Sequence, residues 1–278
     1  MSRAVLRELE TAWLDNENPE GPIFLFLHGY PDTPESWEAQ AAAFSKRGRV
    51  IRPYARGVGG SQAPADRRRY GAYSMLLDHL GILRHCDPEA KRPLHVIGHD
   101  VGGVHAWMLA THPPPGLKSV AVLNSLHPRQ YLRRLLWPRQ VLKSWYMGAF
   151  QLPWLSEAAL LFFNKGLMRH MEEEGWRPPS REMSMREFEG AVLNAMNQYR
   201  SMAREIPTFL REKAAPTAIP ALVLSTEEDR YLEEPSAFEF SDIADSVTVR
   251  VIKGRHWVHR EQPERVNRLL SEFWDGLC

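Results

Sequence analysis

Short apolar runs recur along the chain and are separated by segments with helical periodicity. The runs at residues 23–27, 94–97, 120–123 and 221–224 contain almost no polar positions, which predicts strands that are buried on both faces. Sheets buried on both faces are parallel and are covered by helices. The pattern therefore predicts an α/β architecture.

Helices are predicted between these strands, at residues 35–46 and 73–85, and near the C-terminal end at residues 263–274. Residues 5–15 predict two further short strands, and residues 247–252 predict one more. This alternation of strands and helices is typical of a mostly parallel, doubly wound sheet.

The strand signal stops at about residue 126 and resumes at about residue 216. The residues between are rich in Trp, Met, Tyr, Leu and Arg, and prolines such as Pro207 divide them into helix-like segments. We therefore expect one core formed by residues 1–126 and 216–278, with residues 127–215 inserted as a helical cap. The Trp and Met residues of this cap favour an apolar pocket, although plain helix packing explains most of them better.

Composition narrows the class of protein. The 35 Lys and Arg against 34 Asp and Glu give a net charge of +1, which excludes a basic arm for nucleic acid. No apolar run approaches the ~18 residues that a membrane span needs, and the first ten residues are charged where a signal peptide is apolar. We expect a cytoplasmic protein in which Cys86 and Cys278 are reduced thiols.

A G-x-nucleophile-x-G pattern, with Asp100 at its centre, directly follows the apolar run at residues 94–97. A carboxylate attacks sp³ carbon well and forms an alkyl ester, whereas its attack on an ester or amide gives a costly anhydride. Asp100 therefore favours an alkyl electrophile as substrate. The structural alternative is that Asp100 only caps the helix that follows.

Four ordered segments resemble the motifs of the epoxide hydrolase branch of the α/β-hydrolases. They match H-G-x-P, R-G-x-G-x-S, G-H-D-x-G-G and G-x-H-x-x-x-x-E-x-P-E, and they lie at residues 28–31, 56–61, 98–103 and 254–264. The resemblance covers the chain end to end and implies the α/β-hydrolase fold with an inserted cap. It also implies an oxyanion hole formed by the backbone N–H groups of Tyr30 and Val101, with no cofactor and no metal.

Hydrolysis of an aspartyl ester requires a base, and His has an ordinary pKa suited to that role near neutral pH. His256 has the best context, because it follows the last predicted strand on a loop at the ligand-facing edge of the sheet. The alternative is an ordinary surface histidine. We expect His99 and His259 to be structural hydrogen-bonding groups and His28 to order the oxyanion turn.

A carboxylate normally holds such a base in its working tautomer. Glu227, Glu228 and Asp229 follow the run at residues 221–224, and the resemblance maps the acid best onto Asp229. Thr226 stands near the position where the family has Gly, so Glu227 and Glu228 stay open as alternatives. The rival location after the preceding strand holds Asn124, which carries no charge.

Opening an epoxide leaves an alkoxide, which needs a donor as its charge develops. In the epoxide hydrolases, two cap tyrosines supply it, one before an F-Q-x-P segment and one in an N-x-Y-R segment. Tyr146 and Tyr199 match these positions in order and spacing, with Tyr131 as a less favoured substitute. The alternative for both is packing within the cap.

The resemblance implies hydrolysis of a small apolar epoxide to a vicinal diol through an ester of Asp100. One alternative is a haloalkane or haloacid dehalogenase, but Val101 stands where a haloalkane dehalogenase usually has Trp, and the helix after it lacks arginines. A second alternative is a non-catalytic α/β-hydrolase-fold ligand-binding protein, which needs none of the five side chains Asp100, His256, Asp229, Tyr146 and Tyr199. The sequence leaves open whether the protein is a monomer or a homodimer.

Overall fold

The computed structural model describes residues 1–277 with the exception of 178–184 and 213–214. These residues form an eight-stranded sheet in the order β1-β2-β4-β3-β5-β6-β7-β8. The strands are β1 (Ser2–Leu6), β2 (Leu9–Asp15), β3 (Ile23–Leu27), β4 (Arg49–Pro53), β5 (Leu94–His99), β6 (Leu117–Leu123), β7 (Ala221–Thr226) and β8 (Val247–Ile252). Strands β1, β2 and β4 pair antiparallel, and every pair from β4 to β8 is parallel. The predicted mostly parallel sheet is confirmed.

Ten α-helices lie in the described part of the chain. They are α1 (Glu38–Phe44), α2 (Ala72–Cys86), α3 (Val101–Thr111), α4 (Pro128–Arg134), α5 (Pro138–Lys143), α6 (Trp145–Phe150), α7 (Leu155–Glu173), α8 (Met185–Arg211), α9 (Val258–Glu261) and α10 (Pro263–Asp275). Short 3₁₀ turns at Pro34–Trp37, Arg67–Tyr70 and Ala237–Phe240 complete the list. No described helix is both long and apolar enough to cross a membrane. Cys86 is a free thiol, and Cys278 lies outside the described residues.

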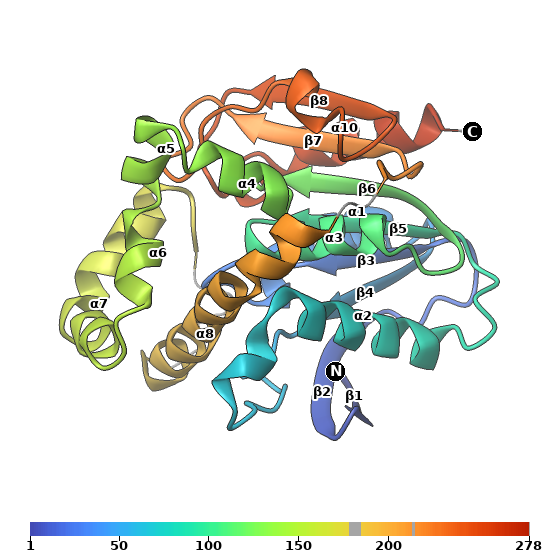
Figure 1. Cartoon of the computed structure of the whole chain (residues 1–278). Coiled ribbons are helices and arrows are strands. Elements are labelled where there is room, and N and C mark those ends of the chain that lie inside the picture. The colour runs from blue at the N-terminus through green and yellow to red at the C-terminus, as the bar shows by residue number, and fades with distance from the viewer. Residues whose placement is uncertain (178–184, 213–214, 278) are drawn as a thin grey trace.

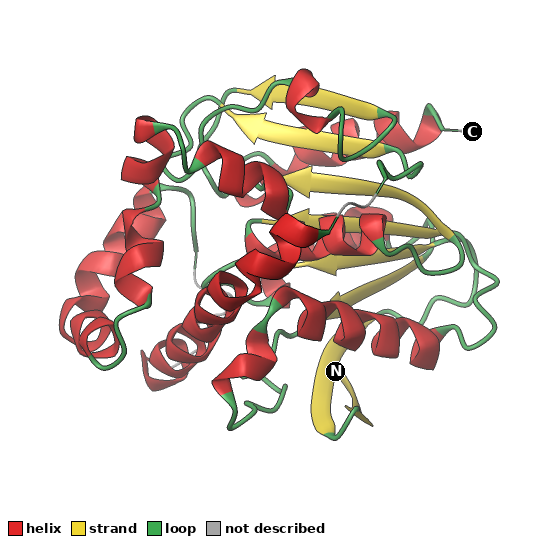
Figure 2. Cartoon of the chain, viewed as in Figure 1, coloured by secondary structure: helices red, strands yellow, loops and turns green. Residues whose placement is uncertain are grey.

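Helices cover both faces of the sheet, as the buried strands require (Figures 1 and 2). Helices α2 and α3 lie on one face, where Trp107 packs against apolar residues of β3, β5 and β6. Helices α1 and α10 lie on the other, where Phe24, Phe44 and Trp274 pack together with ring centroids 4.8–5.4 Å apart. The two apolar layers fix the central strands and therefore the loops at their ends.

Helices α4 to α8 all lie between β6 and β7 in the chain, and no described residue from α4 to α8 belongs to a strand. Figure 1 shows α5, α6 and α7 beyond the arrowheads of the parallel strands, with α4 and α8 leading back from them to the sheet, so the group lies at the carboxyl ends of the strands. In open parallel sheets this edge is where ligands bind. The fold therefore places the inserted helices over the edge that carries the motif residues.

One sequence expectation within these helices is wrong. Pro207 was expected to end a helix, but it lies inside α8. Proline removes one intrahelical hydrogen bond, which normally breaks a helix. Here Phe209 is buried in the core and stacks on Tyr73 with ring centroids 5.7 Å apart. This tertiary contact stabilises the last turn and offsets the lost hydrogen bond.

Buried histidines should make the fold sensitive to mild acid. Burial disfavours the imidazolium and lowers the pKa of His79, His99 and His127 from 6.5 to about 3. Below pH 6.5 the unfolded chain gains protons that these native side chains do not. We expect each to remove on the order of 2 kcal/mol of unfolding free energy between about pH 7 and pH 5, as measured by urea titration.

The raised pKa values of His256 and Asp32 act in the opposite direction and offset a part of this loss, because both groups bind protons more readily in the native state. A free energy of unfolding that stays level or rises over the same pH interval would contradict the prediction.

Candidate active site

Asp100 occupies a strained turn between β5 and α3. Its φ is 52° and its ψ is −121°, a backbone conformation that L-residues rarely adopt. Neighbouring groups fix the turn: the Asp100 N–H donates to the Leu123 carbonyl at 3.1 Å, and the Ser125 hydroxyl donates to the Asp100 carbonyl at 2.6 Å. The turn therefore holds the Asp100 side chain at the carboxyl edge of the sheet.

Glycines make this turn sterically possible. A Cβ atom at Gly98 would lie 2.2 Å from the Gly102 carbonyl oxygen, and one at Gly102 would lie 2.2 Å from the Leu27 carbonyl oxygen. A Cβ atom at Gly29 would lie 2.6 Å from the Cβ atom of Asp100. The glycines of the G-x-nucleophile-x-G pattern and of H-G-x-P are thus required by close packing between β3, β5 and α3.

The Asp100 carboxylate has two different environments. Its Oδ1 accepts a hydrogen bond from the Tyr30 backbone N–H at 2.9 Å. Its Oδ2 lies 3.7 Å from Nε2 of His256. Val101 is the first residue of α3, and the N–H groups of a helix's first turn have no intrahelical acceptor. The Tyr30 N–H therefore contacts the carboxylate oxygen that does not face His256, and the Val101 N–H begins the helix that follows Asp100.

His256 lies between two carboxylates. Its Nδ1 is 2.8 Å from Oδ2 of Asp229, while its Nε2 faces Asp100. The Asp229 carboxylate is buried, and its Oδ1 accepts hydrogen bonds from the backbone N–H groups of Tyr231 at 2.7 Å and Leu232 at 3.0 Å. The side chains of Glu227 and Glu228 are exposed. Of the three acids after β7, Asp229 is the one that contacts His256.

The charges of these groups are coupled. Burial alone would lower the pKa of His256, but the adjoining carboxylates of Asp229 and Asp100 raise it above its ordinary value. Burial alone would raise the pKa of Asp100, but the hydrogen bond and charge of His256 lower it. The two carboxylates therefore favour the protonated form of His256, and loss of the charge on Asp100 would lower the pKa of His256.

Two groups hold the His256 loop: Asn124, which sequence reasoning missed, and His99, which it expected to be a structural hydrogen-bonding group. The side chain of Asn124 donates to the His256 carbonyl at 2.8 Å and to the Thr226 hydroxyl at 3.0 Å. His99 Nε2 also contacts the His256 carbonyl, at 2.9 Å. From the sequence, Asn124 was considered only as an uncharged residue at the rival position for the acid. Its position directly after β6, at the edge shared with Asp100 and Asp229, was the available signal.

Tyr146 on α6 and Tyr199 on α8 face the same space as Asp100. Their rings lie 5.9 Å apart at 83°, and Tyr199 contacts Tyr30 edge-on at 5.2 Å. Burial, followed by the negative charge of Asp100, raises the pKa of both phenols well above the ordinary value. Both hydroxyl groups therefore keep their protons at neutral pH and are available as hydrogen-bond donors.

A buried ion pair fixes the helix that carries Tyr199. The Arg200 guanidinium contacts Glu157 at 2.7 Å and donates to the Phe150 carbonyl at 2.7 Å, which ties α8 to α7 and α6. Tyr131 is engaged elsewhere, since its hydroxyl donates to the Ser144 hydroxyl. The geometry thus favours Tyr199 over Tyr131 as the partner of Tyr146.

Two cavities meet at Asp100. The smaller has a volume of about 400 Å³ and the larger about 940 Å³, and Asp100, Tyr146, Tyr199 and Tyr231 line both. Tyr231, which sequence reasoning did not identify, packs edge-on against the His256 ring with centroids 4.7 Å apart. Most other lining side chains are apolar. The site therefore offers apolar space on both sides of one carboxylate and two phenols.

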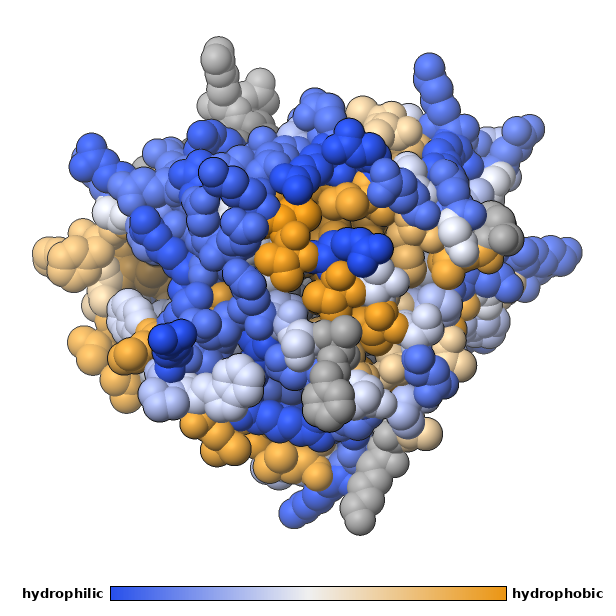
Figure 3. All heavy atoms as spheres, turned by 90° about the horizontal axis from the view of Figure 1, so that it is seen from above, coloured by the Kyte–Doolittle hydropathy of each residue, from blue (hydrophilic) through white to orange (hydrophobic). Residues whose placement is uncertain are grey.

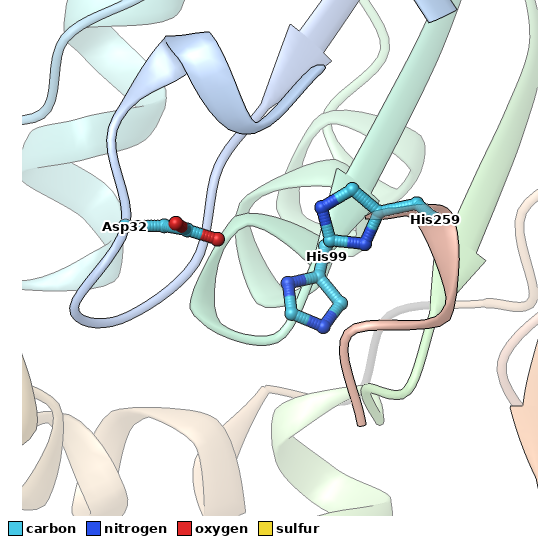
Figure 4. Close-up of side chains that lie close together, drawn as sticks. All are labelled: Asp32, His99 and His259. Atoms are coloured by element: carbon cyan, nitrogen blue, oxygen red, sulfur yellow. The ribbon is translucent and has the colours of Figure 1, made fainter. Parts of the chain in front are cut away.

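A second cluster lies behind His256 and joins Asp32, His99 and His259 (Figure 4). Aspartate and two histidines form a donor set for divalent transition metals. Here Asp32 already accepts from the Trp257 indole N–H at 2.9 Å, and the ring of His259 packs on Trp37 at 4.3 Å. These contacts pack the His256 loop against the loop after β3, and among the described residues they leave the ring nitrogens of His259 and Nδ1 of His99 without a hydrogen-bond partner.

The histidines outside the centre differ in their roles. His28 was expected to order the turn after β3, and its contacts agree with that role. Its Nδ1 contacts the Gly29 carbonyl at 2.9 Å, and its Nε2 accepts a hydrogen bond from the Ala55 N–H at 3.1 Å. His259 does not fit its expected role, because neither ring nitrogen has a hydrogen-bond partner among the described residues. Ring packing in a fully buried position takes the place of hydrogen bonding there.

The fold, the strained aspartate and the His–Asp pair at one edge of the sheet define an α/β-hydrolase-type site. The family model for the alpha/beta hydrolase family matches residues 24–269. The chain belongs to the alpha/beta hydrolase family.

Individual relatives in this family are named epoxide hydrolases. Human epoxide hydrolase 4 is 29% identical over 91% of this chain and 72% of that protein. Epoxide hydrolase A of Mycobacterium tuberculosis is 26% identical over 93% of this chain and 92% of that protein. Among solved structures, an epoxide hydrolase from metagenomes of hot environments is 25% identical, with a TM-score of 0.79 over 98% of this chain and 97% of that chain. The Bacillus megaterium epoxide hydrolase, 19% identical with a TM-score of 0.79 over 99% of this chain and all of that chain, shares the fold.

The charge coupling in the site predicts the titration of His256. In Asp100→Asn, His256 loses one of its two carboxylate neighbours, so its pKa should fall by about one unit or more relative to the unmodified protein. Imidazole ¹⁵N NMR titration measures this shift. Glu228→Gln, which alters an exposed acid of the neighbouring loop, should leave the titration unchanged. Identical His256 titrations in the unmodified protein and Asp100→Asn would contradict the coupling.

Proposed function

We propose that this protein is an epoxide hydrolase that converts an apolar epoxide to a vicinal diol through an ester of Asp100. The observation that carries the proposal is the position of Asp100. The carboxylate faces His256 on one side and a cavity with two protonated phenols on the other. Relatives named epoxide hydrolase over most of the chain support it.

In the first half-reaction, Oδ2 of Asp100 attacks one carbon of the oxirane. The carbon–oxygen bond of the ring breaks, and the departing oxygen takes a proton from Tyr146 or Tyr199. Oδ1, which accepts from the Tyr30 N–H, becomes the carbonyl oxygen of the ester. The resulting tyrosinate regains a proton from solvent, which leaves a neutral hydroxyalkyl ester of Asp100.

In the second half-reaction, His256 acts as the base. Esterification removes the charge of Asp100, so the pKa of His256 falls and the imidazolium releases its proton to solvent, which balances the proton that solvent gave to the tyrosinate. The neutral ring takes a proton from water as that water bonds to the Asp100 carbonyl carbon, and Asp229 stabilises the imidazolium that forms. The N–H groups of Tyr30 and Val101 stabilise the oxyanion. The ester bond then breaks, and the alkoxide of the diol takes the proton from His256.

Residues 127–215 act in this proposal as a cap, and residues 1–126 and 216–278 act as the catalytic core. The cap supplies Tyr146 and Tyr199, whereas the core supplies Asp100, Asp229 and His256. Epoxide binding therefore requires both parts. Side chains of α4 to α8 form much of the cavity lining, and this closure keeps bulk water from the ester until His256 activates one molecule.

Dehalogenation uses the same nucleophile and base but a different leaving group. A halide leaves without a proton, so two phenols with raised pKa values do little to assist its departure. An alkoxide needs a proton or a hydrogen bond as it leaves, which these two phenols can donate. The position after the nucleophile is Val101, which offers a departing halide no side-chain donor. These observations favour the epoxide over the haloalkane.

Replacing the base should trap the ester. In His256→Gln, Asp100 still attacks but water is not activated, so incubation with styrene oxide should add the mass of one substrate molecule to Asp100, as detected by mass spectrometry. In the unmodified protein, single turnover in H₂¹⁸O should instead place the label in the Asp100 carboxylate.

Glu228→Gln serves as the matched control and should accumulate no adduct. No adduct in His256→Gln together with no label in Asp100 would exclude the covalent path. Bromide release from 1-bromobutane at a rate that rivals diol formation would instead favour the dehalogenase.

The two phenols should be partly interchangeable as donors. We expect Tyr146→Phe and Tyr199→Phe each to slow formation of the Asp100 ester by about a hundredfold, and the double variant to abolish it. Tyr131→Phe is the control and should change the rate little, since its hydroxyl bonds Ser144. Rapid-quench measurement of ester formation separates this step from hydrolysis. Ester formation at an unaltered rate in the double variant would assign the donor elsewhere.

A further inference from the structure

The outer surface of the inserted helices is unusually apolar. Phe162 is 87% exposed and Trp154 is 83% exposed, and both lie in or next to α7. Most of the large apolar side chains that the described residues expose lie between residues 136 and 163. We call this set the apolar cap face: Leu136, Trp137, Val141, Leu142, Trp145, Leu152, Trp154, Leu155, Leu161, Phe162 and Phe163.

These side chains share one side of the molecule. Helices α5, α6 and α7, which carry most of them, lie together at the left of Figure 1, and in Figure 3 apolar side chains reach the surface at the left edge. Leu142, Trp145 and Phe163 come from or adjoin three different helices and line the larger cavity. The apolar cap face therefore adjoins the larger cavity, which Asp100 also lines, through these three exposed side chains. Exposed apolar patches of this extent mark interaction surfaces.

The charge of the same segment is strongly one-sided. Residues 133–169 contain six basic residues and one acid. Arg133, Arg134 and Lys143 pair with Asp242, Glu239 and Glu233, and the acid Glu157 pairs with Arg200, so the outward charge of the segment comes from its other three basic residues. Arg139, Lys165 and Arg169 are exposed beside the apolar side chains. Aromatic and aliphatic side chains flanked by Lys and Arg are the composition of segments that bind at a lipid–water interface.

We propose that the apolar cap face docks on the surface of an anionic phospholipid bilayer. Trp154, Leu155 and Phe162 insert at the headgroup boundary, and the basic side chains contact lipid phosphates. A second copy of the chain is the less suitable occupant, because a twofold interface would bring the exposed Arg139, Lys165 and Arg169 of both copies together. Docking would place the larger cavity beside the phase in which an apolar substrate concentrates, although the binding itself does not depend on the reaction.

Cosedimentation with lipid vesicles tests this proposal without any turnover. Vesicles of phosphatidylcholine with about a third phosphatidylglycerol should bind the protein. Vesicles of pure phosphatidylcholine should bind it at least about tenfold more weakly. Leu155→Gln combined with Phe162→Gln, and Arg139→Gln combined with Arg169→Gln, should each lower the vesicle partition coefficient about tenfold. None of these four side chains lines either cavity, so activity on dissolved substrate should stay unchanged.

Val5→Gln is the matched control, because Val5 is 74% exposed on β1, and it should leave binding unchanged. The proposal is overturned if neither vesicle binds the protein or if both bind it equally. It is also overturned if sedimentation velocity shows a dimer that the Leu155→Gln and Phe162→Gln variant dissociates. Because no reaction is measured, failure of docking and failure of the epoxide hydrolase proposal are distinguishable.

Discussion

The site depends on one backbone constraint, the positive φ of Asp100. A strained residue of this kind costs about 1–3 kcal/mol and persists only where its surroundings over-determine it. Here β5 pairs on both sides with parallel strands, and Gly98 and Gly102 let α3 approach the sheet closely enough to hold the turn. The same packing brings Gly29 against Asp100 and aims the Tyr30 N–H at its carboxylate. The strain thus fixes the Asp100 carboxylate and the Tyr30 N–H, the proposed nucleophile and oxyanion donor, relative to each other.

The arrangement of charge follows from that placement. Asp100, Asp229 and His256 come from three loops at one edge of the sheet, and two carboxylates there share one imidazolium. Because both carboxylates support the charge of His256, any step that neutralises Asp100 changes the protonation of His256. In the proposed reaction, His256 would therefore become available as a base only after the ester has formed. The electrostatics would set the order of the two proposed half-reactions. Asn124 and His99 hold the loop that carries His256.

Local signals in the sequence were enough for the sheet and for the spacing of the motif residues. The uninterrupted apolar runs became β3, β5, β6 and β7, and the motif around Asp100 fell at the predicted strand-to-helix junction. These local signals did not predict the contacts between residues far apart in the sequence. Asn124 bonds a carbonyl 132 residues away, Tyr231 packs on His256 through a turn that Asp229 organises, and Phe209 keeps α8 helical past Pro207. Each depends on which segments meet in space, which residue patterns do not encode.

The composition of the inserted helices shows why a residue type alone does not assign a role. Their Trp and Met side chains divide into three environments: Met196 and Trp176 are buried in packing, Met147 lines the smaller cavity, and Trp154 is exposed. Helices that pack one face against the core leave their opposite face in water, so they cannot bury apolar side chains on both faces. An apolar inner face is explained by an apolar substrate, but the outer face is then left in water at a cost that packing does not offset. Since Arg139, Lys165 and Arg169 are exposed on that same segment, an anionic interface accounts for both the apolar and the basic side chains of the outer face, whereas a stability argument accounts for neither.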